Sequence, residues 1–156
     1  MYRASADVDF VVDPTADQLE ALAEALGDEF YVYRDAMAEA RRQPGTFNAI
    51  HEATSFKIDF FLKGPTAFDA EELRRSIRQR LGADPPIMIK SPEDTILRKL
   101  EWFRRGGGAS DRQWHDVVSI LGALRGRLDE GYLDHWAGDL GVTDLLDRAR
   151  RESAGL

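Results

Sequence analysis

Three aspartates stand out because each one lies in an apolar segment that is typical of a β-strand. Asp7 and Asp9 alternate with apolar residues near the start of the chain, and Asp59 lies within the apolar run 58–61. Side chains alternate along a strand, so Asp7 and Asp9 point to the same face, roughly 6–7 Å apart. Like charges this close destabilise a sheet unless an opposite charge balances them. A divalent cation is one such charge.

The three carboxylates meet at one point if the strand of Asp59 lies beside the first strand. Asp7, Asp9 and Asp59 would then be ligands for Mg²⁺ or Mn²⁺, hard cations that prefer oxygen. Two such ions about 3.5–4 Å apart activate an attacking oxygen and stabilise a leaving pyrophosphate. The alternative is that these aspartates lie at strand edges and face water, and their spacing alone leaves both interpretations open.

Hydrophobic periodicity predicts the elements that must position these groups. Period-2 runs dominate the first half of the chain and period-3.6 runs the second half, so we expect an α+β fold with a mixed sheet, flanking helices and a helical C-terminal half. We expect an α/β core over 1–90 and a helical region over 91–156, packed as one domain. The predicted strands are 7–12, 30–33, 47–51, 56–62 and 87–89, and the predicted helices are 16–26, 34–42, 70–81, 92–105, 110–124, 129–137 and 143–152.

Composition narrows the class of protein. The chain has 156 residues, a net charge of −7 and no cysteine, which excludes disulfide frameworks, thiolate zinc sites and cysteine nucleophiles. No uncharged stretch approaches the roughly 18 residues of a membrane span, and the N-terminus has no apolar signal core. We therefore expect a cytoplasmic protein with no membrane partner.

Four segments carry a resemblance to a known family. The first is Arg3-x-Ser5-x-Asp7-Val8-Asp9, and the second is the apolar strand that contains Asp59. The third is Ser91–Leu100, which contains Lys99, and the fourth is Asp111–Asp116, which contains Arg112 and ends at Asp116. In this order and spacing they resemble nucleotidyltransferases of the polymerase-β superfamily, and most closely the small bacterial members similar to abortive-infection toxins of the AbiEii type. The resemblance covers roughly residues 3 to 148.

The resemblance implies a metal-dependent transfer of a nucleoside monophosphate from an NTP to a hydroxyl or phosphate group. The cofactor would be Mg²⁺ or Mn²⁺, held by Asp7, Asp9 and Asp59. The acceptor would be RNA, for example a tRNA end, a protein side chain or a small molecule. In a toxin-type system, an antitoxin would be a further partner.

The same resemblance assigns roles to residues outside the carboxylate strands. Arg3, Ser5, Lys99 and Arg112 would bind the nucleotide, and Asp116 would be a further catalytic residue that orients the triphosphate or acts as a base. The alternative for Lys99 and Asp116 is an ion pair between consecutive helices at the surface, worth ~0–1 kcal/mol. The alternative for Arg112 is a solvated helix charge.

The chain departs from the family before its first aspartate. Family members have a helix there with a Gly-Gly or Gly-Ser motif, whose backbone N–H groups hold phosphates, whereas six residues precede Asp7. Either the start codon lies further upstream or this is a minimal form, and we expect the 156-residue chain to transfer nucleotides poorly or not at all. The alternative function is a catalytically degenerate fold that binds a nucleotide, a nucleic acid or a protein, with an exposed sheet edge suited to a homodimer.

The predicted metal site leads to a binding experiment. Isothermal titration with Mn²⁺ should show binding, and Asp9→Asn should weaken it by more than the roughly 10–100-fold that the loss of an outer-shell partner costs, because a ligand itself is removed. Equal affinities of the variant and the natural chain would show that this carboxylate is not a ligand.

Overall fold

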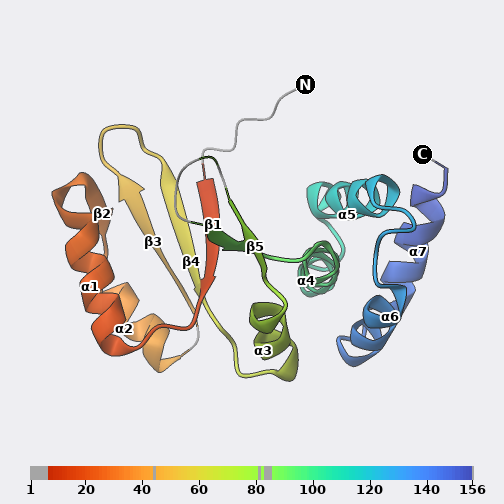
Figure 1. Ribbon diagram of the computed structural model, residues 1–156, viewed down its shortest axis with the longest axis horizontal. Coiled ribbons are helices and arrows are strands. Elements are labelled where there is room, and N and C mark those ends of the chain that lie inside the picture. The colour runs from red at the N-terminus through yellow and green to blue at the C-terminus, as the bar shows by residue number, and fades with distance from the viewer. Residues whose placement is uncertain (1–6, 44, 81, 83–85, 156) are drawn as a thin grey trace. The chain divides into compact units, whose positions relative to one another are not determined.

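The computed structural model describes residues 7–43, 45–80, 82 and 86–155, with the backbone alone at Asp7 and Arg41 (Figure 1). The chain divides into two compact units, Met1–Leu73 and Arg74–Leu156. The predicted α+β class is confirmed, with a mixed sheet in the first unit and a largely helical second unit. Within the described residues, no helix is long and apolar enough to cross a membrane.

The first unit contains four strands, β1 (Asp7–Val12), β2 (Phe30–Val32), β3 (Thr46–His51) and β4 (Lys57–Leu62). They form one sheet in the order β1-β4-β3-β2. The outer strand β1 pairs with β4 in parallel, whereas β4 with β3 and β3 with β2 pair antiparallel. The sequence predicted β1, β3 and β4, the three strands around the carboxylates, to within one residue.

Two helices, α1 (Ala16–Leu26) and α2 (Arg34–Arg42), pack on one face of this sheet (Figure 1). A capping box starts α1, in which the Thr15 hydroxyl accepts from Gln18 N–H and the Gln18 side chain accepts from Thr15 N–H. The short 3-10 turn η1 (Gly27–Glu29) connects α1 to β2. Apolar side chains from both layers form the core, namely Leu19, Ala23, Met37, Ala40, Phe47, Ala49 and Phe60.

The segment after the sheet differs from the predicted helix over 70–81. Helix α3 (Ala67–Arg74) begins at Thr66, whose N–H and hydroxyl both donate to Asp69, and it ends well before Leu81. The chain then forms β5 (Ile77–Gln79), which pairs antiparallel with β6 (Ile87–Ile89). The helical spacing of the apolar residues was misleading here, because antiparallel pairing with β6, the next strand in the chain, supplies backbone hydrogen bonds in place of helical ones.

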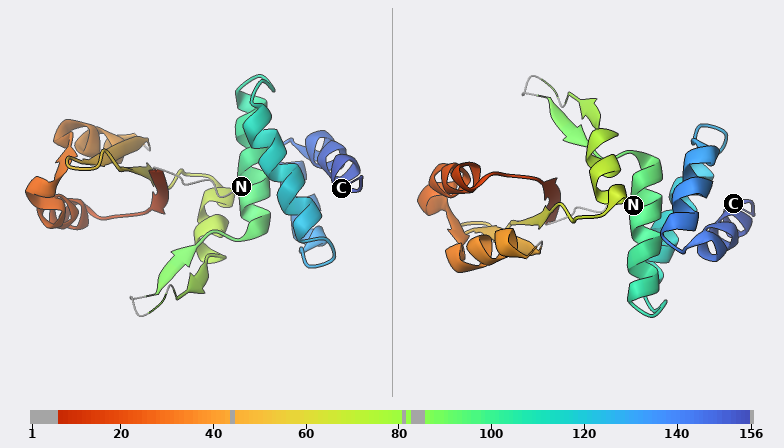
Figure 2. Two further views of the ribbon diagram at one scale, coloured as in Figure 1. Left: turned by 90° about the horizontal axis from the view of Figure 1, so that it is seen from above. Right: turned by 90° about the horizontal axis from the view of Figure 1, so that it is seen from below.

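The second unit also contains four longer helices whose apolar faces form its core. The N-cap Ser91 and Pro92 at the first helical position start α4, as the sequence predicted. Helices α4 and α5 lie side by side, and α5 also contacts α7 (Figure 2). The helices are α4 (Pro92–Arg105), α5 (Asp111–Ala123), α6 (Glu130–Asp139) and α7 (Thr143–Ser153), and their fully buried side chains include Ile96, Leu97, Leu100, Val117, Leu133 and Leu146.

The stacked phenylalanines of the sheet give a test of its core. The Phe60 ring is 6% exposed and lies 4.7 Å from the Phe47 ring, centroid to centroid. Phe60→Ala should lower the free energy of unfolding by about 3–5 kcal/mol, because the substitution leaves a cavity. Phe56→Ala is the control, since Phe56 is 37% exposed. Urea denaturation of both variants measures the difference, and equal losses would contradict the assigned core.

Candidate functional site

The sheet has one face covered by α1 and α2 and an opposite face that carries polar side chains together with the apolar pair Val11 and Phe61. Side-chain alternation places Phe60 and Phe47 on the covered face, so Asp59 and Asn48 lie on the opposite one. Asp9 is directly opposite Asp59 across the parallel β1–β4 pair, and Asn48 is opposite Asp59 on the other side. Because neighbouring strands are ~4.8 Å apart, these three residues form one short row across the sheet.

The strand of Asp59 thus lies beside the first strand, as the predicted site requires. The backbone of Asp7 lies opposite Lys57, one pleat along from the row of Asp9 and Asp59. The Asp7 side chain lies outside the described residues, as do Arg3 and Ser5, so Asp9 and Asp59 are the described members of the predicted triad. Among the side chains that the structure describes, no three acidic or histidine groups cluster closely enough to hold a metal ion.

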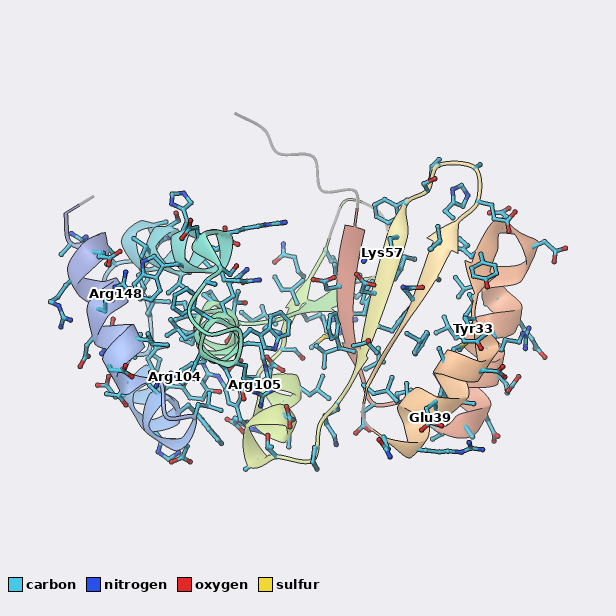
Figure 3. All side chains as sticks on the ribbon, turned by 180° about the vertical axis from the view of Figure 1, so that it is seen from behind. Tyr33, Glu39, Lys57, Arg104, Arg105 and Arg148 are labelled. Atoms are coloured by element: carbon cyan, nitrogen blue, oxygen red, sulfur yellow. The ribbon has the colours of Figure 1, made fainter. Side chains whose placement is uncertain are left out.

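A lysine on the same face balances part of this negative charge. This residue is Lys57 on β4 (Figure 3). Its ammonium lies 2.6 Å from Asp59 Oδ2, and the side chains of Lys57 and Asp59 are 40% and 19% exposed. Asp9 is exposed and forms no ion pair within the described part of the chain. The i, i+2 spacing puts Lys57 and Asp59 on one face. This spacing could have identified Lys57 as the counter-charge, where the sequence-based prediction was a divalent metal ion.

The donor atoms on this face are of the chemical kind that a hard divalent cation takes, with two described carboxylates rather than three. Asp9 and Asp59 offer carboxylate oxygens from adjacent strands in register, and the Asn48 amide offers a neutral oxygen beside them. Such all-oxygen sets are what Mg²⁺ and Mn²⁺ prefer. A divalent cation at Asp59 would have to share the carboxylate with the Lys57 ammonium, or it would have to displace the ammonium from the carboxylate.

In the second unit, the structure brings together two predicted site residues. Lys99 Nζ on α4 lies 2.9 Å from Asp116 Oδ2 on α5 and donates to Gln113 Oε1 at 2.9 Å. Gln113 was not predicted, although it precedes Asp116 by three residues and so shares its helix face. Arg112 is exposed in the first turn of α5. The lysine is therefore held in one orientation by two helical side chains.

A buried acidic pair at the start of α4 was also missed by sequence reasoning. Asp94 is fully buried and accepts from the Ser91 hydroxyl and from the Tyr132 hydroxyl, both at 2.6 Å. Its neighbour Glu93 accepts from Asp129 N–H at 3.0 Å, and the Arg75 guanidinium lies 3.5 Å from Glu93. These bonds tie the N-terminus of α4 to the start of α6, so we interpret the pair as structural.

A tryptophan joins two other helices of the same unit. Trp114 Nε1 donates to Glu152 Oε2 at 2.7 Å, and Arg148 Nε donates to the other Glu152 oxygen at 2.9 Å. The hydrogen bond from Trp114, followed by that from Arg148, lowers the pKa of Glu152 below its usual value. Trp114 therefore contributes to the contact between α5 and α7, as an anchor between the helices.

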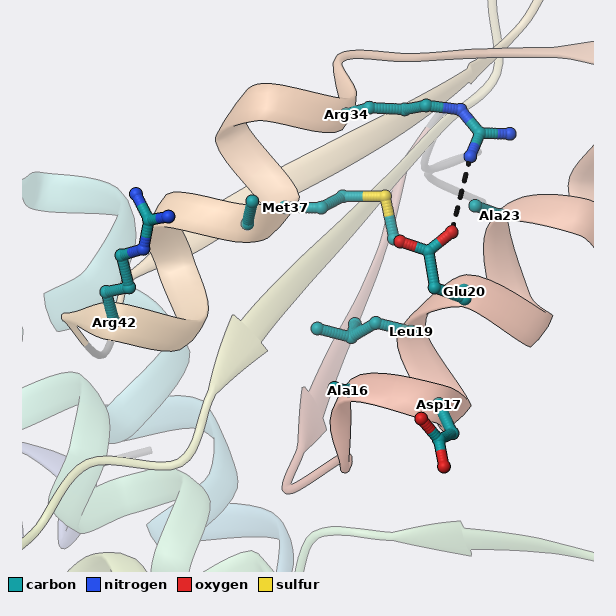
Figure 4. A pocket seen from close by; sticks show the side chains of 9 residues that line it. Ala16, Asp17, Leu19, Glu20, Ala23, Arg34, Met37 and Arg42 are labelled. Atoms are coloured by element: carbon teal, nitrogen blue, oxygen red, sulfur yellow. Dashed lines mark ion pairs between the residues drawn. The ribbon is translucent and has the colours of Figure 1, made fainter.

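A groove between α1 and α2 is separate from the carboxylate face. Leu19 and Met37 line its floor, and Arg34 on one side lies 3.5 Å from Glu20 on the other (Figure 4). None of the residues that line it belongs to the predicted site.

No family model matches the chain, and no curated protein is significantly similar to it.

The contribution of the Lys99–Asp116 ion pair to the free energy of unfolding can be measured. Asp116→Asn should lower the free energy of unfolding by no more than about 1 kcal/mol, because both side chains reach solvent. Asp144→Asn, which removes the partner of Arg104 at the surface, is the control and should cost about as little. Thermal denaturation compares the two, and a much larger loss for Asp116→Asn would assign the pair a structural role.

Proposed function

We propose that this chain is a nucleotidyltransferase-like protein that transfers a nucleoside monophosphate from an NTP to an acceptor, with Mg²⁺ or Mn²⁺ as cofactor. The observation that carries the proposal is the register of β1 and β4, which puts Asp9 opposite Asp59 on the face that α1 and α2 leave open. The acceptor would be RNA such as a tRNA end, a protein side chain or a small molecule. The protein would act in the cytoplasm, as a toxin-type enzyme with an antitoxin partner.

Under this proposal, the carboxylates of the first unit hold the cation. Asp9 and Asp59, with Asp7 one pleat away, would hold the ion in a fixed position because they project from paired strands. A bound divalent ion stabilises negative charge that develops on the transferred phosphate and on the leaving pyrophosphate. Lys99 would bind a phosphate oxygen, and Asp116 would keep its ammonium oriented.

A second candidate function is supported by the ion pair on the same face. Because Lys57 neutralises Asp59 without any metal, the sheet can keep its carboxylates as a stable, non-catalytic surface. The chain would then bind a nucleotide, a nucleic acid or a protein without transferring anything.

A labelling experiment separates the two candidates. The chain is incubated with each labelled NTP, Mg²⁺ and total bacterial RNA or protein, and we expect slow labelling that Asp59→Asn reduces by about 10²-fold or more, because a charge-stabilising group is lost. Asp13→Asn is the matched control, since Asp13 follows β1 directly and pairs with Lys63 at 2.6 Å. It should label as the natural chain does.

Two outcomes would contradict the enzymatic proposal. Labelling that survives in Asp59→Asn would show that this carboxylate takes no part in transfer. Nucleotide binding without any labelling would favour the non-catalytic candidate.

A further inference from the structure

The position of Lys57 on the carboxylate face is the starting observation. Lys57 and Asp59 are two residues apart on β4, so both side chains lie on the face of Asp9. The Lys57 ammonium lies 2.6 Å from Asp59 Oδ2. In the register of the sheet, Lys57 is also the residue opposite Asp7. A single positive charge therefore lies among positions that sequence and register make acidic.

The charges explain why this lysine would stay there in the absence of a metal. Asp9 and Asp59 are neighbours across parallel strands, and like charges directly opposite each other destabilise a sheet. Asp59 is 19% exposed, so water screens its charge only in part, and an ammonium in contact supplies the missing compensation. Lys57 is 40% exposed on a flexible four-carbon stem, so it can release Asp59 and return to solvent without disturbing the sheet core.

We propose that Lys57 is a built-in counter-cation, which holds Asp59 while no divalent cation is bound and must release it before a cation can bind there. This inference rests on the proposed function, because it concerns the same carboxylates. Lys57 is then a positioning residue. It keeps the site folded and charge-balanced when empty, and it lowers the apparent affinity for the metal, because every binding event must first break the ion pair.

The chain contains a matched control for this ion pair. Lys63 Nζ lies 2.6 Å from Asp13 Oδ2, just beyond the opposite ends of the same two strands. The two pairs have the same chemistry and the same N–O distance, but Asp13 is not part of the predicted metal site. A general effect of removing a lysine from this sheet would therefore appear at both positions.

The test is Mn²⁺ binding, followed by isothermal titration and by the electron paramagnetic resonance signal of the free ion. Lys57→Met should bind Mn²⁺ about fivefold more tightly than the natural chain, because the competing ion pair is gone. Lys57→Arg keeps the charge and should restore the natural affinity, whereas Lys63→Met should leave the affinity unchanged. Equal or weaker binding by Lys57→Met would overturn the inference.

A second measurement needs no substitution and so decides the matter even if Lys57→Met fails to fold. Addition of Mg²⁺ to the natural chain should shift the NMR signal of the Lys57 ε-methylene group, while the Lys63 signal stays in place. A Lys57 signal that does not move while Mg²⁺ binds would overturn the inference.

The failure of this inference can be told from the failure of the proposed function. In one outcome, the natural chain binds Mn²⁺, Asp9→Asn weakens this binding, and Lys57→Met does not change it. That outcome supports the metal site and contradicts the role proposed for Lys57. If neither the natural chain nor Lys57→Met binds a divalent cation, the proposed metal-dependent function falls, and the inference about Lys57 falls with it.

Discussion

The parallel, in-register pairing of β1 with β4 is the constraint on which the candidate site depends. It puts Val8, Phe10 and Val12 beside Ile58, Phe60 and Leu62 on one face. Of these, Phe60 belongs to the core that α1 and α2 cover, and Val12, Ile58 and Leu62 pack against it. The same register leaves Asp9 beside Asp59 on the other face. A slip of one residue would bury the acids and expose the apolar side chains, so the packing of the core and the position of the carboxylates are set by the same pairing.

The register that buries the apolar face therefore also sets two aspartates opposite each other on the other face, and the sheet has to accommodate their repulsion. The Lys57–Asp59 ion pair is the accommodation that the structure contains. It explains how a sheet with facing aspartates can be stable by itself. It also means that the charge on this face is adjustable, because one of the two partners is a long, half-exposed side chain.

The acidic residues of the second unit have different hydrogen-bond partners depending on how deeply they are buried. Asp94 is fully buried, and it accepts from two hydroxyl groups inside the unit, so it has no access to solvent. Asp116 instead shares a partly exposed lysine with Gln113. Lys99 thus combines a defined orientation with access to solvent, which is what binding a phosphate group requires.

The sequence by itself determined the α+β class, the strands around the carboxylates, the start of α4 and the shared face of Lys57 and Asp59. These features depend on residues close together in the chain, through side-chain alternation, helical periodicity and capping. The tertiary structure decided the rest. The register that sets Asp9 against Asp59 and the burial of Asp94 under Tyr132 join distant segments. The contact of Lys99 with Asp116, which the sequence left as one of two alternatives, also joins two helices. Such contacts form where packing brings segments together, and local patterns carry no information about which segments those will be.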